Sequence, residues 1–237
     1  MLRKFKILGI SLARGGSKAV KNKNIKELSG KPLIYYTIKE ALKSKYLTDY
    51  IISTDSKKIK KIAEKYKAEV PFLRPKNLSN DRASSSSALI HAVKFLEKKN
   101  RVKYDYIIEL MCTAPFKTVN DIDNCIKKII KTNADSVIAL KKLDDHHPAR
   151  IKKIIKDKIV NFCAEEKAES RRQDLKPLAY VRAGAIYALK RDFLIKTKRR
   201  YGSKNSRAYV LDALKSINID SLEDFLLAEA IIKKNIK

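Results

Sequence analysis

A chain of 237 residues has the length of one ordinary α/β domain, and 44% hydrophobic residues can bury a sizeable core, which excludes wholesale disorder. The composition is strongly basic, since 54 lysines and arginines against 26 aspartates and glutamates give a formal net charge of +28. No apolar run approaches the roughly 20 residues that span a bilayer. The three cysteines form no CxxC pair, which argues against a disulfide framework or structural zinc and favours a reducing, cytoplasmic compartment.

The positive charge by itself has three interpretations: nucleic-acid binding, attraction of an anionic small molecule, or lysines spread over every exposed face. Its distribution favours the last one. Basic residues interrupt apolar ones at helix-surface spacing, as in residues 57–62 and 127–131, and no basic tail stands apart. Aromatic residues do not interleave with basic ones as they do in base-stacking surfaces. The charge count alone therefore does not indicate nucleic-acid binding, and the distribution of the basic residues argues against nucleic acid as the partner.

Strand and helix patterns alternate over the first part of the chain. In chain order we predict a strand at Phe5–Ala13, a helix at Pro32–Lys45, a strand at Tyr50–Ser53, a helix at Lys57–Lys67, a strand at Val70–Leu73, a helix at Ser84–Lys98, a strand at Tyr104–Met111, a helix from Thr118 to Thr132 and a strand at Asp135–Leu140. Alternation of this kind predicts an α/β fold with a mainly parallel twisted sheet flanked by helices.

The alternation breaks from about 141 to 178, a stretch with two short apolar segments and a charged run. We interpret this stretch as an arm embedded in a single domain of residues 1–237, and we expect it to form a homodimer. Strand character returns at Tyr180–Leu189 and again at Lys215–Asp220, and a final helix is predicted at Ser221–Lys234 with Ser221 as its cap.

Ligands of parallel α/β sheets bind beyond the carboxyl ends of the strands, so residues just after strands deserve most weight. The first predicted strand ends in a glycine loop, Ala13-Arg14-Gly15-Gly16-Ser17-Lys18, which matches neither GxGxxG nor GxxxxGK[ST]. Two glycines nevertheless allow backbone N–H groups to form an anion nest, while Arg14 and Lys18 add charge. Lys23 and Asn24 follow within reach of the same loop. The residues alone fit a phosphate site and a plain tight turn equally well.

Several motifs together resemble the acylneuraminate cytidylyltransferases, the CMP-sialic acid synthetases. The resemblance runs through nearly the whole chain, in the correct order. It rests on Leu12–Lys18, Lys23-Asn24-Ile25, Lys31–Ile34, Ile51–Asp55, Leu73-Arg74-Pro75, Leu78–Asp81, Ala83-Ser84-Ser85, His146-His147-Pro148, Arg182–Tyr187 and Ile217–Asp220.

This resemblance implies a nucleotide-diphospho-sugar transferase-like, Rossmann-like fold with a small dimerisation arm. It also implies a reaction, in which CTP and an acidic nine-carbon sugar give CMP-sugar and pyrophosphate with Mg²⁺, as in cell-surface polysaccharide biosynthesis. By position, the triphosphate would contact Arg14, Lys18 and Lys23, and Asp220 would bind the metal beside Asn218. The nucleotide-binding residues implied are Leu12, Ala13, Arg14, Gly15, Gly16, Ser17, Asn24, Arg74, Ala83 and Ser85.

The chain departs from the family pattern mainly on the sugar side. Asn218 replaces the first aspartate of an Asp-x-Asp pair, Met111 replaces a sugar-side glutamine, and Ala183 replaces an asparagine. Our hypothesis is that CTP is retained and the sugar is a legionaminic or pseudaminic acid, whose additional acyl groups and missing 9-hydroxyl favour less polar contacts.

Two arginines are candidates for the sugar carboxylate, because a guanidinium matches it bidentately. Arg172 aligns better with the family, whereas Arg182 fits a structural salt bridge equally well. We identify no general base. The alternatives are a synthetase for the eight-carbon keto acid Kdo, whose glycine loop differs, and a basic nucleic-acid-binding protein on a degraded enzyme fold.

Overall fold

A computed structural model describes residues 5–16, 20–143, 146–165 and 170–234. A six-stranded sheet with strand order β10-β6-β9-β5-β1-β4 forms its centre. All strands run parallel except β9, which is antiparallel to both of its neighbours. The strands are β1 (Ile7–Leu12), β4 (Asp49–Ser53), β5 (Tyr106–Leu110), β6 (Ser136–Lys142), β9 (Tyr180–Lys190) and β10 (Ser206–Leu211).

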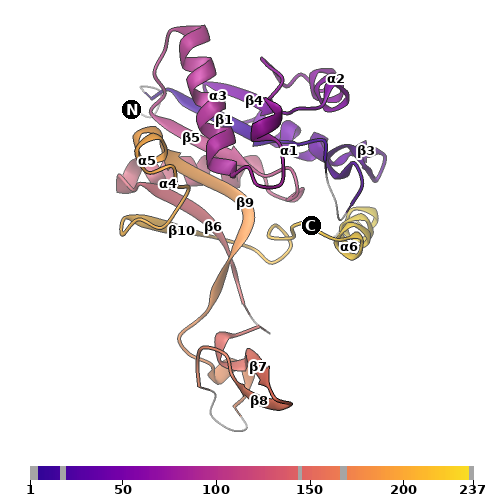
Figure 1. Ribbon diagram of the computed structural model, residues 1–237, viewed down its shortest axis with the longest axis vertical. Helices are drawn as coiled ribbons and strands as arrows, with labels where there is room; N and C mark the ends of the chain where they lie inside the picture. Colours follow the sequence, from indigo (N-terminus) through magenta and orange to yellow (C-terminus); the bar gives the residue numbers. More distant parts are fainter. Residues whose placement is uncertain (1–4, 17–19, 144–145, 166–169, 235–237) are drawn as a thin grey trace.

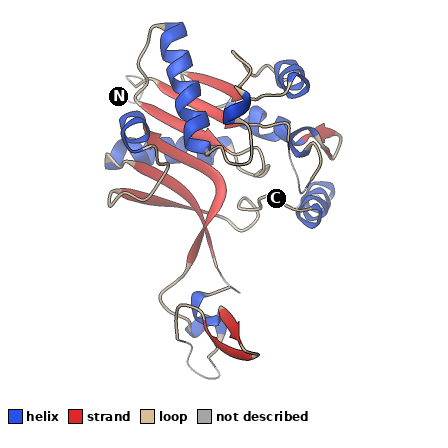
Figure 2. Ribbon diagram, in the orientation of Figure 1, coloured by secondary structure: helices blue, strands red, loops and turns tan. Residues whose placement is uncertain are grey.

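Helices cover both faces of this sheet, as the predicted alternation requires (Figures 1 and 2). One apolar cluster joins the sheet to α1 (Leu33–Ala41), α2 (Lys57–Lys65) and α4 (Val119–Thr132). The cluster on the other face joins it to α3 (Ser85–Asn100) and α5 (Arg191–Thr197). The last helix, α6 (Leu222–Lys233), packs on a third and smaller cluster with the segment that carries the β2–β3 hairpin (Glu27–Leu28 and Lys31–Pro32).

Local capping signals set the beginnings of several helices. Ser56 accepts a hydrogen bond from the backbone of α2, and Ser84 does the same for α3. Thr118 and Ser221 each form a full capping box, with Asp121 at the start of α4 and with Asp224 at the start of α6. These contacts are local in sequence, which is why the predicted starts of these helices agree closely with the observed ones.

The segment between β6 and β9 extends away from the sheet, below it in Figure 1. It contains the antiparallel hairpin of β7 (Lys152–Ile155) and β8 (Lys158–Asn161). Its residues are largely exposed, because the hairpin packs on no layer of the central sheet.

Two predicted strands are wrong, and the prediction misses α5, β10 and the strands of the β2–β3 and β7–β8 hairpins. Residues 70–73 form no strand, since only Leu73 makes an isolated bridge, to Thr54 just after β4, and residues 215–220 form turns and loop. The apolar side chain of Ile219 packs against α6 instead of joining a sheet. Among the unpredicted elements, β10 lacks a strict apolar alternation because it is an exposed edge strand.

None of the helices in the described ranges has the length and apolar character that a bilayer crossing demands.

Candidate functional site

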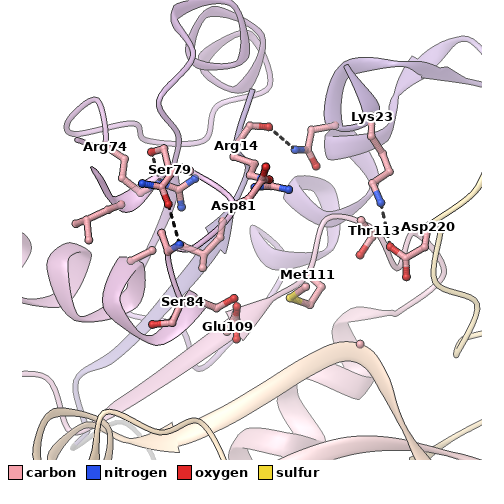
Figure 3. Close-up of a pocket in the computed structure, with 18 of the residues that line it drawn as sticks. Arg14, Lys23, Arg74, Ser79, Asp81, Ser84, Glu109, Met111, Thr113 and Asp220 are labelled. Carbon is pink, nitrogen blue, oxygen red and sulfur yellow. Dashed lines mark hydrogen bonds and ion pairs between the residues drawn. The ribbon is translucent and has the colours of Figure 1, made fainter. Parts of the chain in front are cut away.

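A cavity of about 660 Å³ opens at the carboxyl ends of β1 and β5 (Figure 3). Most of the sequence-predicted site residues that the structure describes come together here. Those that line the cavity are Leu12, Arg14, Lys23, Asn24, Arg74, Ala83, Ser85, Met111, Asn218 and Asp220.

The glycine loop leaves β1 and passes directly over the start of α2. The backbone N–H of Gly15 donates to Oδ1 of Asp55 at 2.9 Å, and a Cβ on Gly15 would lie 3.1 Å from Cβ of Ser56. A side chain at this position would crowd α2, so glycine permits the close approach. The buried Asn24 donates from Nδ2 to the carbonyl of Arg14 at 3.1 Å, which holds the loop from its other side. Ser17 and Lys18 lie outside the described residues.

Two arginines face the cavity from different elements. Arg14 Nη1 donates to Oδ1 of Asp81 at 2.7 Å, and both side chains are partly exposed. Arg74 is buried and donates from Nε to Oγ of Ser79 at 3.1 Å. Burial lowers the pKa of the Arg74 guanidinium, and the carboxylate of Asp55 partly offsets this effect. The pair supplies cationic donors that an anionic nucleotide can contact.

Lys23 and Asp220 lie on the opposite side of the view in Figure 3 from Arg74, and they form a second group with Asn218. Lys23 Nζ donates to Oδ1 of Asp220 at 3.0 Å and to the carbonyl of Ile219 at 2.8 Å. Asn218 donates from Nδ2 to Oδ2 of Asp220. Its own Oδ1 is buried and accepts no hydrogen bond from the described residues.

Gly184 brings β9 close to this group. It has φ of +61°, and a Cβ there would lie 3.4 Å from both Cγ and Oδ1 of Asn218. Glycine is therefore required for the backbone conformation and leaves room for the amide.

The turn after β5 is held by a buried lysine. Lys117 Nζ lies 2.6 Å from the carbonyl of Met111, 2.8 Å from that of Ala114 and 2.7 Å from Oγ1 of Thr37. Burial lowers the pKa of Lys117 to about 7. The same turn also contacts the segment before α6, because the backbone N–H of Ile219 donates to the carbonyl of Thr113 at 2.7 Å. Lys117 thus fixes the turn on which the Asn218–Asp220 segment rests.

Glu109 also lines the cavity, and the sequence analysis missed it. It is fully buried on β5, and its Oε2 accepts from Arg200 Nη1 at 2.7 Å. Burial raises the pKa of Glu109, and the positive charge of Arg200 opposes that rise. The signal was present in the sequence, because Glu109 is an acidic residue between Ile108 and Leu110 in the apolar part of the predicted strand.

The structure does not bring the two predicted sugar-binding arginines to this cavity within one chain. Arg172 lines a separate cavity of about 230 Å³ at the base of the arm, beside His147 and Leu175. Arg182 lies on β9 with its guanidinium 4.2 Å from the centre of the Tyr201 ring.

The arrangement supplies what a nucleoside triphosphate needs. The cationic side chains of Arg14 and Lys23 line the cavity and suit the phosphates of a nucleotide, whereas Ser84 and Ser85 at the start of α3 line another part of it. A carboxylate beside an amide oxygen, at Asp220 and Asn218, adds hard oxygen ligands at the same cavity. Transfer of a phosphoryl group depends mostly on such positioning and charge.

The family profile described as cytidylyltransferase matches residues 8–236. A pseudaminic acid cytidylyltransferase of Campylobacter jejuni is 34% identical over 97% of each chain. A CMP-N,N'-diacetyllegionaminic acid synthase of the same species is 32% identical, also over 97% of each chain. An N-acylneuraminate cytidylyltransferase of Escherichia coli is 32% identical over 97% of this chain and 52% of its own length.

Solved structures are similar in fold. A CMP:2-keto-3-deoxy-manno-octonic acid synthetase complexed with CTP superposes with a TM-score of 0.72 at 16% identity, covering 98% of this chain and 100% of the other. A 4-diphosphocytidyl-2C-methyl-D-erythritol synthase of Anaerococcus prevotii gives 0.65 at 15% identity, covering 98% of each chain. The predicted fold class is therefore confirmed, and the chain belongs to the cytidylyltransferase family.

Proposed function

We propose that this chain transfers CMP from CTP to a nonulosonic acid of the pseudaminic or legionaminic type. The anomeric hydroxyl of the sugar attacks the α-phosphorus of CTP and forms the new P–O bond. The bond between the α-phosphorus and the bridging oxygen breaks, pyrophosphate leaves with the electron pair, and the hydroxyl proton passes to water. The observation that carries the proposal is the gathering of Arg14, Lys23, Arg74 and Asp220 around one cavity.

The geometry supports roles for individual residues on the nucleotide side. Arg14 and Lys23 carry the charges suited to the triphosphate, and Lys18 follows in the same loop of the sequence. The loop 74–85 and the first turn of α3 line the remaining part of the cavity, which suits the nucleoside.

The sugar class is supported by the residues on the other side and by the relatives. Met111 lines the cavity and presents a thioether, which makes only weak hydrogen bonds. Two relatives are named for pseudaminic acid or N,N'-diacetyllegionaminic acid, and each is matched over 97% of its length. We assign Arg172 and Arg182 to the sugar carboxylate only as candidates of suitable chemistry, because a second chain or a movement of the arm would have to bring them to the cavity.

We also propose Mg²⁺ as the cofactor, and the residues present fit this ion. The buried Oδ1 of Asn218 accepts no hydrogen bond from the described residues, and it lies beside the carboxylate of Asp220. Proteins commonly hold Mg²⁺ by one or two such oxygens together with waters and substrate phosphates. Asp220 and Asn218 would hold the ion, which supplies stabilisation of the charge on the leaving pyrophosphate.

A homodimer formed through the arm is part of the proposal. The β7–β8 hairpin and the residue after it expose apolar side chains, with 75% of Ile154, 74% of Ile159 and 60% of Phe162 accessible. Apolar surface of this kind favours burial against another chain.

We place the reaction in the cytoplasm, where CTP is available. Cys112, Cys125 and Cys163 are free thiols, which is the state that a reducing compartment favours.

The test is pyrophosphate release from CTP and Mg²⁺ with N-acetylneuraminic, legionaminic, pseudaminic and Kdo acids in parallel. We expect release with legionaminic or pseudaminic acid above the other two. Clear preference for N-acetylneuraminate would contradict the sugar assignment, and release with Kdo alone would assign the chain to the eight-carbon class. If no sugar supports release and calorimetry detects no CTP binding, the cytidylyltransfer proposal itself is wrong.

A further inference from the structure

Glu109 places a carboxylate in an otherwise apolar layer. On the sheet it is paired with Ile10 of β1 on one side and with Tyr187 of β9 on the other. Its side chain is 0% exposed. It lies on the same face of β5 as that of Ile107, two positions earlier, and this face packs against α3. Burying a charge in such a layer is costly unless it is paired and fully hydrogen-bonded.

The described residues donate a hydrogen bond to only one of the two carboxylate oxygens of Glu109. Arg200 donates to Oε2 at 2.7 Å, and its guanidinium is held 4.6 Å above the Tyr187 ring. Oε1 accepts no hydrogen bond from any residue in the described ranges. The ion pair therefore holds the carboxylate in one orientation and leaves one acceptor for another partner.

A molecule bound in the cavity beside Glu109 can supply the hydrogen-bond donor that Oε1 lacks. Glu109 lines it together with Ser84, Ser85 and Ala88 of the α3 end. Figure 3 draws Glu109 next to Ser84, while Lys23 and Asp220 lie at the other side of the view. This part of the cavity, at the first turn of α3, is the part that suits the nucleoside, so the group facing Glu109 is an uncharged part of the nucleotide that can donate a hydrogen bond.

We propose that Oε1 of Glu109 accepts a hydrogen bond from the nucleoside and thereby selects the nucleotide. The two donors of suitable chemistry are the 4-amino group of cytosine and the 2′-hydroxyl of the ribose. A carboxylate accepts from the cytosine amine and disfavours uracil, which presents a carbonyl oxygen at that place. This inference rests on the proposed use of CTP.

The Glu109→Gln variant reverses the polarity of this contact. Arg200 Nη1 requires an acceptor, so the amide oxygen turns toward Arg200 and the amide NH₂ takes the place of Oε1. The cavity wall then presents a donor, which pairs with the carbonyl oxygen of uracil and not with an amine.

The experiment is calorimetry of nucleotide binding without any sugar, using CTP, UTP and 2′-deoxy-CTP on the wild-type and Glu109→Gln chains. If the amine is the donor, the preference of the wild type for CTP over UTP falls by about tenfold or more in the variant. If the 2′-hydroxyl is the donor, the preference for CTP over 2′-deoxy-CTP falls instead. Because this binding measurement needs no sugar, it still tests Glu109 if the pyrophosphate-release assay finds no turnover and the proposed reaction is wrong.

The matched control is Glu97→Gln, which removes one charge from another partly buried ion pair of α3. Glu97 binds Arg191 at 2.8 and 3.0 Å and lies near the opposite end of the helix from Ser84. We expect this variant to lose stability and keep both nucleotide preferences. Unchanged preferences in Glu109→Gln as well would overturn the proposal and make Glu109 a structural ion-pair residue.

A second variant keeps the test decisive if Glu109→Gln does not fold. Glu109→Asp retains the charge and withdraws the carboxylate by one methylene. Its CTP affinity is expected to fall about fivefold or more, with CTP still bound better than UTP. An unaltered CTP affinity would overturn the proposal.

Discussion

Lys23 and Asp220 meet at 3.0 Å although 197 positions separate them in the chain. The lysine side chain is only 14% exposed, whereas that of Asp220 is 70% exposed. The contact joins the segment after the glycine loop to the N-terminal end of α6 across the mouth of the cavity. It places a fixed cation beside an accessible carboxylate.

We expect Asp220→Ala to lower turnover at least about 100-fold, because it removes the only carboxylate assigned to the metal. Asn218→Asp is expected to keep turnover and to lower the Mg²⁺ concentration needed for half-maximal rate. The aspartate removes the amide that donates to Asp220 and adds an anionic ligand. The measurement is pyrophosphate release against Mg²⁺ concentration.

Asp212→Ala is the control for these variants. Asp212 is a carboxylate of the same segment whose side chain is 83% exposed and whose Oδ2 lies 3.7 Å from Lys215 Nζ. Its removal should leave the Mg²⁺ dependence unchanged. An Asp220→Ala enzyme with normal turnover would disprove the metal assignment.

Met111→Gln should shift sugar preference toward N-acetylneuraminic acid. The glutamine amide adds donors and an acceptor at the cavity wall, and these favour the more polar sugar. Its backbone contacts to Lys117 and Ala185 do not involve the side chain and are expected to persist. The ratio of kcat/KM for the two sugar types measures the effect, with Met111→Leu as the apolar control. Equal ratios in all three chains would remove Met111 from the specificity determinants.

Stability is expected to depend on pH through Lys117. Burial lowers its pKa in the folded chain to about 7, below its ordinary value of 10.5. Between these two pH values the unfolded chain binds one more proton than the folded chain, so this lysine makes stability rise with pH there. Lys117→Met removes that rise and leaves the carbonyls of Met111 and Ala114 without this donor.

Urea unfolding of the wild type and of Lys117→Met at pH 7 and pH 9 measures this difference. We expect the variant to be less stable by about 2 kcal/mol at pH 9 and by less at pH 7. A stability difference that does not change with pH would show that Lys117 titrates outside this window.

Replacing Ile154 and Ile159 by lysine should convert a dimer to a monomer. The two side chains are 75% and 74% exposed in the single chain, and charges on both would oppose their burial against a partner. Light scattering after size exclusion gives the mass. Leu226→Lys on α6 is the control, since Leu226 is 58% exposed and lies far from the arm in the fold. A wild-type chain that is monomeric throughout would contradict the proposed dimer.

Local signals in the sequence determined much of the architecture. Short apolar runs predicted β1, β4, β5 and β6, because strands that are buried on both faces of a parallel sheet are apolar along their length. Capping residues placed the starts of α2, α4 and α6, because a cap contacts only backbone within the next turn. The resemblance to the cytidylyltransferases then predicted many of the residues that line the cavity, among them Arg14, Arg74 and Asp220.

Only the tertiary structure decided the contacts between distant segments. β10 has a partner on only one side, and its weak apolar pattern reflects exposure, whereas Ile219 is apolar because it packs beneath α6. The burial of Glu109 against Arg200 and the meeting of Lys23 with Asp220 depend on which loops the sheet order brings together. The periodicity of apolar residues depends on whether each residue is buried or exposed within its own element. It cannot identify a contact partner 91 positions away, as Arg200 is from Glu109, or 197 positions away, as Asp220 is from Lys23.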